Sequence, residues 1–281
     1  MKVIISGGGT GGHIYPAVAI ANEIKRQRPQ ADILFVGALG KMEMEKVPRE
    51  GYRIVGLPIA GFNRSNLVAN LSFPFKLMKS MWQGYQVVKG FRPDIAVGVG
   101  GFASGPTLKI ANFLGIKTLI QEQNSYAGVT NKILSQKAEK VCVAYPGMEK
   151  FFPPEKIVFT GNPVRNDMLL PGISKEEAKR HFGLDPARPT LLVIGGSLGA
   201  KSINTALAKD LRSLQEKGIQ IIWQTGKNFQ EPIEDRSGIY LTEFIYEMDK
   251  AYAAADFVVS RAGALAVSEL ALVGKAAILV P

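Results

Sequence analysis

Short apolar runs alternate with longer amphipathic segments along the whole chain. The runs predict strands at 2–6, 32–37, 53–59, 94–99, 117–121, 140–144 and 156–160, and then at 190–195, 219–224, 239–242, 256–260 and 276–280. The stretches between them predict helices, among others at 16–28, 66–89, 104–114, 201–217 and 264–273. This alternation is typical of α/β proteins, in which parallel sheets are joined by right-handed helical crossovers.

Two turn-rich segments in the middle of the chain predict a domain junction. The segments are Gly161-Asn-Pro-Val164 and Pro171-Gly172. We therefore expect two Rossmann-like domains, at 1–163 and 164–281, which suits a chain of 281 residues. The chain ends directly after the apolar run 276–280, which is typical of a buried strand. We accordingly expect the second domain to be incomplete at its C-terminus.

The charge is unevenly distributed between these two halves. Residues 1–163 carry 20 Lys and Arg against 10 Asp and Glu, whereas residues 164–281 carry 14 of each. The net charge of +10 thus belongs to the first half, and residues 51–93 contain six basic residues, seven aromatic residues and no acidic one. This asymmetry indicates an anionic surface or polyanion as a partner of the first domain. The single cysteine, Cys142, indicates a reducing compartment, and no apolar run approaches the ~18 residues of a spanning helix.

Two glycine-rich turns follow predicted strands and open predicted helices. The first is Gly7-Gly-Gly-Thr-Gly-Gly-His13, and the second is Gly195-Gly-Ser-Leu-Gly-Ala200. Glycine lets the backbone approach a ligand closely, and the helix start behind it offers N–H groups and the positive end of a dipole. Two such turns, in equivalent positions of two α/β halves, predict an enzyme that holds an activated, phosphate-bearing substrate.

Each turn also fits a better-known motif that its surroundings argue against. Residues 7–12 fit G-x-G-x-x-G, but a dinucleotide fold also needs an acid at the end of the second strand, and residues 37–40 read Gly-Ala-Leu-Gly. Residues 195–199 fit the nucleophile elbow G-x-S-x-G, which requires a histidine after the serine in chain order. Both histidines, His13 and His181, precede Ser197, so Ser197 is better interpreted as a phosphate contact.

His13 is the candidate for general acid–base chemistry. It ends the first glycine turn, at a strand-to-helix crossing where α/β proteins bind ligands, although a structural role is the alternative. His181 lies in a charged helix and is expected to be a surface residue. We expect no metal site, because the chain contains no Asp-x-Asp pair and no Cys/His cluster with metal-ligand spacing. The charge of a leaving group would then be met by helix N-termini and arginine.

The segment 62–92 mixes aromatic, apolar and basic side chains without acids before Asp94. Two interpretations remain open: an amphipathic helix of the core, or an interfacial surface that meets an anionic membrane. The residues expected to face a membrane are Phe75, Lys76, Lys79 and Trp82. No motif supports nucleic acid as the anionic partner.

Taken together, seven motifs resemble those of one family, the undecaprenyl-diphospho-muramoylpentapeptide β-N-acetylglucosaminyltransferases of bacterial peptidoglycan synthesis. The motifs are Gly7 to His13, Gly100-Gly-Phe-Ala-Ser-Gly105, Glu122-Gln-Asn124, Gly161-Asn-Pro-Val-Arg165, Gly195 to Ala200, Phe244-Ile245 and Ser260 to Glu269. The resemblance implies two facing Rossmann-like lobes of the glycosyltransferase B type. It also implies inverting transfer of N-acetylglucosamine from its UDP donor to the lipid-linked muramoyl-pentapeptide, a step in cell-wall biogenesis that bears on cell shape and division.

The resemblance further assigns roles to residues of both lobes. His13 would be the base that activates the acceptor hydroxyl. Thr10, Gly11, Gly12 and Asn124 would face the sugar, with Gly100 and Gly101 in an acceptor loop. In the second lobe, Ile245 would contact uracil through its backbone and Glu269 the ribose hydroxyls. The residues that would meet the diphosphate are Ser197, Ala264, Leu265, Arg165 and Arg261.

The same resemblance implies a peripheral protein on the cytoplasmic face of the bacterial inner membrane, with no cofactor and UDP-N-acetylglucosamine as the donor substrate. Family members usually continue past the end of this chain with a segment that reads the donor sugar, so the activity of this chain is an open point. Two alternatives remain: a non-hydrolysing UDP-sugar epimerase of the same fold, and a non-catalytic UDP-sugar-binding fragment.

Overall fold

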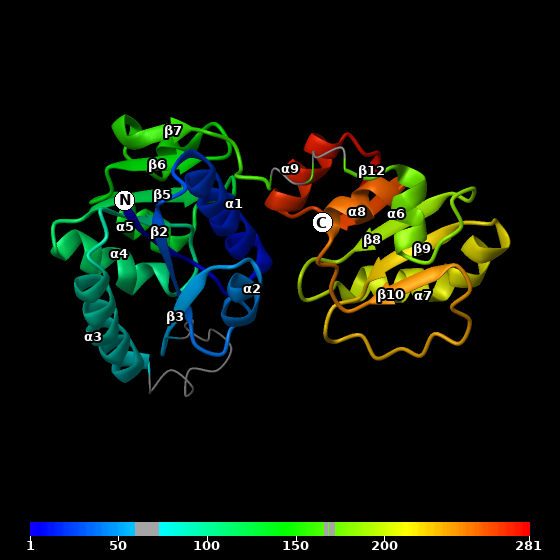
Figure 1. The fold of residues 1–281 in the computed structure, drawn as a ribbon, viewed down its shortest axis with the longest axis horizontal. Coiled ribbons are helices and arrows are strands. Elements are labelled where there is room, and N and C mark those ends of the chain that lie inside the picture. Colours follow the sequence, from blue (N-terminus) through cyan, green and yellow to red (C-terminus); the bar gives the residue numbers. More distant parts are fainter. Residues whose placement is uncertain (60–72, 166–167, 169–171) are drawn as a thin grey trace. The chain divides into compact units, whose positions relative to one another are not determined.

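The computed structural model describes residues 1–59, 73–165, 168 and 172–281, and these residues form two compact units. The first unit comprises Met1–Arg165 and the second Asn166–Pro281 (Figure 1). Each of the twelve predicted strands is present, within two residues of its expected bounds. The predicted helix 66–89 is seen as Phe73–Phe91, and its expected first seven residues lie outside the described part of the chain.

The first unit is built on a parallel sheet of seven strands in the order β3-β2-β1-β4-β5-β6-β7. The strands are β1 (Lys2–Ser6), β2 (Asp32–Ala38), β3 (Arg53–Leu57), β4 (Ile95–Gly98), β5 (Lys117–Glu122), β6 (Lys140–Val143) and β7 (Ile157–Phe159). The helices are α1 (Gly11–Gln27), α2 (Glu43–Arg49), α3 (Phe73–Phe91), α4 (Ser104–Phe113) and α5 (Val129–Ser135). The chain enters the sheet at β1 and turns to either side of it, which makes the carboxyl ends of β1 and β4 a topological switch point.

Apolar cores cover both faces of this sheet. Val3 and Ile5 of β1 pack with Ile14 and Val18 of α1 on one face. Ile4, which points the other way, belongs to the core that includes Val88 of α3 and Ile110 of α4. The nearly uninterrupted apolar sequence of β1 is therefore explained, because successive side chains of a parallel strand enter two different cores.

The second unit repeats the plan with a parallel sheet of five strands in the order β10-β9-β8-β11-β12. The strands are β8 (Thr190–Ile194), β9 (Gln220–Gln224), β10 (Ile239–Thr242), β11 (Phe257–Arg261) and β12 (Ala277–Val280). The helices are α6 (Lys175–His181), α7 (Lys201–Glu216), α8 (Met248–Ala254) and α9 (Ala264–Val273). Ile278 and Leu279 of the edge strand β12 are 67% and 43% exposed. The two parallel α/β sheets confirm the predicted fold class.

Candidate functional site

The first glycine loop leaves the carboxyl end of β1 and runs into α1. It lies against the loop that follows β4, because a Cβ on Gly101 would collide with the backbone of Gly8. Gly101 also has a φ of +86°, a conformation that favours glycine. The two loops of the switch point thus approach each other through backbone atoms, at the edge of the sheet where ligands of parallel α/β proteins bind.

His13 lies in the first turn of α1, between these two loops. Its Nδ1 is 3.3 Å from the Thr10 hydroxyl, and a Cβ on Gly100 would lie 2.8 Å from the imidazole Cδ2. Burial lowers the pKa of His13 below 6.5, while Glu122, a hydrogen bond with the Gly8 backbone and Glu43 act in the opposite direction. The imidazole is therefore mainly neutral at pH 7, which is the state required of a general base.

Glu122 organises the loop that follows β5. This buried carboxylate accepts hydrogen bonds from the Asn124 backbone N–H at 3.1 Å and from the Asn124 side-chain amide at 3.0 Å. It also accepts the Gly128 N–H at 3.0 Å and the Asn131 amide at 2.9 Å. The carboxylate thereby fixes the position of Asn124, which is itself exposed to solvent.

Three residues of this site were missed as site residues from the sequence: Glu122, Asn131 and Glu43. Glu122 lies in one of the seven motifs, and the signal for it is an acidic residue directly after an apolar predicted strand. Asn131 is buried in α5, and its amide nitrogen would lie 3.8 Å from a Cβ on Gly100, next to the His13 ring. Glu43 gave no sequence signal, because it lies in an ordinary charged stretch, Lys41 to Lys46.

The second glycine loop leaves the carboxyl end of β8 in the other unit. Gln224, at the end of the neighbouring strand β9, is buried and joins two backbones. Its amide nitrogen donates to the Gly196 carbonyl, and its amide oxygen accepts from the Ile245 N–H, both at 2.9 Å. Gln224 therefore holds the glycine loop and the predicted uracil-contacting backbone of Ile245 in a fixed relation.

The remaining predicted donor-site residues of the second unit cluster around β11 and α9. Arg261 is the exposed last residue of β11, and Ala264 and Leu265 form the first turn of α9. Glu269 lies one turn further on, where its Oε2 accepts a hydrogen bond of 3.2 Å from the Tyr252 hydroxyl of α8. Ser197 is half-buried within the glycine loop. These positions keep their predicted roles in donor binding as hypotheses.

Arg165 differs from the other predicted diphosphate contacts because it belongs to the first unit. Its guanidinium carbon lies 5.0 Å from the centre of the Tyr15 ring, and its Nη1 is 3.8 Å from a carboxylate oxygen of Glu50. The side chain is buried, with only 9% of its surface exposed. Its predicted contact with the diphosphate remains a hypothesis.

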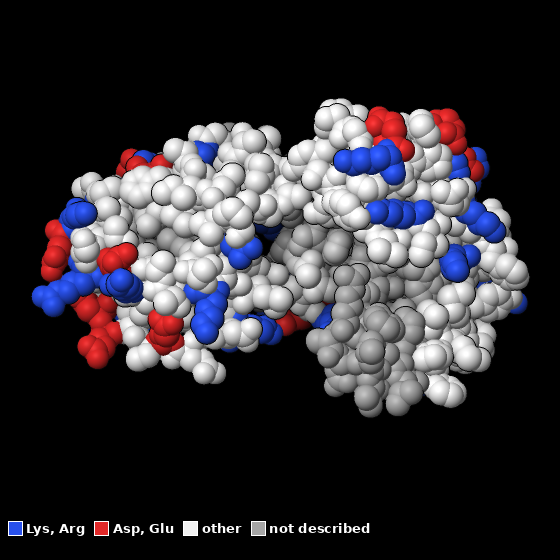
Figure 2. Space-filling model, turned by 180° about the vertical axis from the view of Figure 1, so that it is seen from behind, with Lys and Arg blue, Asp and Glu red and all other residues white. Residues whose placement is uncertain are grey.

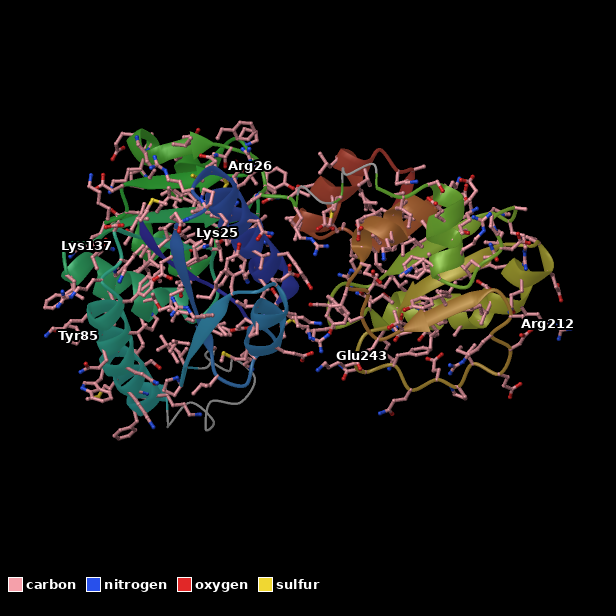
Figure 3. All side chains as sticks on the ribbon, in the orientation of Figure 1. Lys25, Arg26, Tyr85, Lys137, Arg212 and Glu243 are labelled. Atoms are coloured by element: carbon pink, nitrogen blue, oxygen red, sulfur yellow. The ribbon has the colours of Figure 1, made fainter. Side chains whose placement is uncertain are left out.

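An apolar groove of about 650 Å³ lies on the first unit, between α3, α4 and the end of α5. Its lining is largely apolar and includes Met81, Trp82, Tyr85, Ile110, Phe113, Ile133 and Leu134, together with Lys109 and Lys137. Figure 3 shows Tyr85 and Lys137 on the same side of this unit. Phe75, Met78 and Trp82 of α3 are 76%, 71% and 66% exposed. In the described part of the chain, no helix combines the length and apolarity needed to cross a membrane.

Exposed basic side chains lie on the same helices as this apolar surface. Lys76 and Lys79 of α3 and Lys109 of α4 are all exposed. On the face seen in Figure 2, the acidic side chains of the first unit gather mainly near its upper edge, while basic side chains are spread more widely. The helix α3 is thus neither fully a core helix nor fully an interfacial one: Ser80, Gly84 and Val88 face inward, and the aromatic and basic residues face outward.

Comparison with known proteins agrees with the two-unit plan. The model of the glycosyltransferase family 28 N-terminal domain matches residues 3–143, and that of the family 28 C-terminal domain matches residues 190–281. The crystal structure of MurG from Acinetobacter baumannii is 31% identical, with a TM-score of 0.68 over 100% of this chain and 79% of that chain. A UDP complex of Staphylococcus aureus MnaA, 13% identical with a TM-score of 0.69 over 99% of this chain and 78% of that one, shares the fold.

Curated relatives are more similar still. A protein of Bacteroides fragilis is 55% identical over 100% of this chain and 76% of its own length, and one of Cytophaga hutchinsonii is 56% identical over 100% of this chain and 76% of its own length. Both carry the name UDP-N-acetylglucosamine–N-acetylmuramyl-(pentapeptide) pyrophosphoryl-undecaprenol N-acetylglucosamine transferase. The resemblance found in the seven motifs is confirmed, and the chain belongs to glycosyltransferase family 28 and, within it, to the family of these N-acetylglucosamine transferases.

Proposed function

We propose that this protein transfers N-acetylglucosamine from UDP-N-acetylglucosamine to the muramoyl sugar of undecaprenyl-diphospho-muramoyl-pentapeptide, with inversion and release of UDP. The observation that carries the proposal is the 55% identity, over the whole chain, to a transferase named for that donor and that acceptor. The geometry of the first unit supports it, because a neutral imidazole lies at the switch point of a parallel sheet.

The chemistry needs one base and one stabilised leaving group. His13 accepts the proton of the acceptor hydroxyl as that oxygen attacks the anomeric carbon of the donor sugar. The bond from the anomeric carbon to the diphosphate breaks in the same displacement, and the electron pair leaves with UDP. Ser197, Arg261 and the first turn of α9 stabilise the negative charge on the diphosphate, since a helix N-terminus favours anions.

A transfer assay tests the proposal directly. The protein is incubated with radiolabelled UDP-N-acetylglucosamine and a lipid-linked muramoyl-pentapeptide analogue, and the products are separated by chromatography. We expect label in the lipid fraction and release of UDP. Conversion of the donor to its epimer without an acceptor would establish the epimerase alternative instead. Donor binding without turnover would establish the second alternative, a non-catalytic protein that binds the UDP-sugar.

We further propose that the groove on α3, α4 and α5 docks on an anionic phospholipid surface, at the cytoplasmic face of the inner membrane where the lipid-linked acceptor would be met. Exposed Phe75 and Trp82 supply apolar contact, and Lys76 and Lys79 supply charge. Each basic residue close to an anionic surface contributes about 1 kcal/mol, an attraction that salt screens within a Debye length.

Liposome sedimentation tests this docking surface. Binding should rise with the fraction of anionic lipid and fall with salt, and Lys76→Glu with Lys79→Glu should weaken it. The control is the pair Lys209→Glu and Lys217→Glu, which makes the same charge change at exposed positions of the second unit. Equal weakening by both pairs would mean that net charge matters and this surface does not. Equal binding to neutral and anionic vesicles would remove the electrostatic contribution.

A further inference from the structure

A buried carboxylate lies directly beneath the first glycine loop. Glu43, the first residue of α2, is 1% exposed. Its Oε2 accepts the Gly9 N–H at 2.9 Å, and its Oε1 accepts the Ala38 N–H at 2.9 Å. One side chain therefore joins the loop that follows β1 to the end of the adjacent strand β2.

The backbone around Glu43 leaves room for this carboxylate and for little else. A Cβ on Gly8 would overlap the Glu43 carboxyl group, and a Cβ on Gly37 would lie 2.6 Å from its Cγ. Two glycines, one in the loop after β1 and one in β2, thus make the space that Glu43 fills. A buried carboxylate is strongly unfavourable unless hydrogen bonds satisfy it, and here both oxygens receive a backbone N–H.

This arrangement changes what the first glycine loop can bind. Loops of this kind usually hold a phosphate, because their N–H groups and the helix dipole attract an anion. At Gly9 the N–H already donates to the protein's own carboxylate. A substrate phosphate at the same place would lose that donor and would be repelled by the buried negative charge.

We propose that Glu43 is a positioning residue and the internal anion of the first glycine loop. Its carboxylate takes the place at Gly8 and Gly9 that a substrate phosphate would occupy, and it holds the loop in the conformation that seats His13. The expected effect on turnover rests on the proposed transferase function. The claim that Glu43 fills an anion position does not depend on that function.

Glu43 is connected to His13 in two ways: through the backbone of the glycine loop and through the charge of its carboxylate. His13 is influenced by the charges of Glu43 on α2 and Glu122 on β5, and it is within hydrogen-bond distance of the Gly8 backbone and the Thr10 hydroxyl. Both carboxylates raise the pKa of His13, and burial lowers it. Removing the charge of Glu43 while keeping its shape must therefore lower the pKa of His13 further, since one of the two attractive charges is lost.

NMR titration of the histidine rings tests this link without any assay of transfer. The chain has two histidines, so the spectrum of histidine-labelled protein is simple. In Glu43→Gln we expect the His13 titration to move to lower pH, while the signals of His181, whose Nε2 lies 2.8 Å from Glu247, stay in place. The matched control Glu247→Gln should change the His181 signals alone. An unchanged His13 titration in Glu43→Gln, or equal movement of both histidines, would overturn the proposal.

Anion rescue tests the occupied position itself. Glu43→Ala leaves two backbone N–H groups facing an empty, carboxylate-sized space, so formate should raise the melting temperature of this variant and not of the wild type. Chloride at the same ionic strength is the control. A formate effect of equal size in the wild type, or none in Glu43→Ala, would mean that no anion position exists there.

Kinetics then separate positioning from general damage. Glu43→Gln should lower kcat about 10²-fold, the usual effect of small misplacement in an active site, and leave the affinity for UDP unchanged. Glu45→Gln, an exposed position on the same helix, should have kcat within twofold of wild type. A normal kcat in Glu43→Gln, or a parallel loss of UDP affinity, would refute positioning by Glu43. Absence of transfer by the wild type would refute the proposed function alone, since the NMR and formate results stand without it.

Discussion

The two glycine loops occupy equivalent places in their sheets but are held by opposite kinds of side chain. In the first unit a carboxylate, Glu43, accepts the Gly9 N–H. In the second unit a neutral amide, Gln224, donates to the Gly196 carbonyl. In both cases the side chain belongs to a strand that pairs with the strand before the loop, or to the helix directly after that neighbouring strand. The two loops share their topology, but the supporting side chain accepts a hydrogen bond from the first loop and donates one to the second.

This difference explains how one fold used twice can serve two substrates. A carboxylate consumes a loop N–H and adds negative charge, so the first loop is suited to orienting His13 rather than to holding a phosphate. An amide that bonds to a loop carbonyl consumes no N–H of that loop and adds no charge. The second loop therefore remains suited to an anionic donor, in agreement with the predicted roles of Ser197 and Arg261.

The largest test of this division is His13→Ala. If the first unit supplies the chemistry, loss of the general base should lower kcat about 10²-fold or more. The affinity for UDP, measured by calorimetry, should change little, because all of its predicted contacts except Arg165 lie in the second unit. His181→Ala is the control for loss of a histidine elsewhere. A tenfold loss of kcat or less in His13→Ala would assign the imidazole a structural role.

Glu269→Ala tests the opposite side of the comparison. A carboxylate can accept hydrogen bonds from both ribose hydroxyls, and bonds to a charged group contribute roughly 1.5–3 kcal/mol. We expect UDP binding to weaken by that amount, with kcat at saturating donor close to wild type. Tyr252→Phe, which removes the hydroxyl that donates to Glu269, should weaken UDP binding less. Unchanged UDP affinity in Glu269→Ala would exclude this residue from the donor site.

Gln224→Ala should destabilise the second unit by about 1–3 kcal/mol, because it leaves the buried Ile245 N–H without this acceptor and removes one of two donors to the Gly196 carbonyl. Thermal unfolding of the variant measures this loss, and a weaker UDP affinity should accompany it. Gln230→Ala, at an exposed position of the same unit, is the control. Equal stability of the two variants would show that the amide bridge contributes little.

The pH dependence of kcat/KM should show the smallest of these effects, and it should distinguish the unit that contains His13 from the unit predicted to bind UDP. His13 has a pKa below 6.5 and acts in its neutral form, so kcat/KM should fall on the acid side only below pH 6.5. Folding stability should follow the same sign: the contribution of neutral His13 is present above pH 6.5 and is lost as the pH falls below it, because the unfolded chain binds the proton more readily. UDP affinity should not share this acid limb. An acid limb above pH 6.5 would contradict the effect of burial.

The sequence was sufficient for the fold because the fold follows from periodicity. The stretches 3–5 and 191–194 contain no polar residue between their ends, so they predict strands covered on both faces, as the corresponding parts of β1 and β8 are. The glycine loops could be located as well, since each stands between such a strand and a helix. His13 and Glu269 were identified from motifs whose order along the chain matches one family.

The supports of the two loops could not be predicted in this way. Glu43 and Gln224 act through backbone groups that are distant in sequence, and Gly9 is separated from Glu43 by 34 positions. An acid near the start of a helix is most often a solvated residue that favours the dipole. Only the space left by Gly8 and Gly37, which depends on the pairing of β1 with β2, shows that this one is buried.

The two tryptophans of the chain divide between the two units, one in each environment. Trp82 of α3 is 66% exposed, whereas Trp223 of β9 is fully buried and its indole N–H donates to the Asn204 side-chain oxygen at 3.1 Å. Their emission should differ in colour and in access to a quencher such as acrylamide. The red-shifted, quenchable fluorescence of Trp82 should report on the surface of the first unit. The shielded fluorescence of Trp223 should report on the interior of the second unit. The protein thus carries its own pair of optical labels, one for each half.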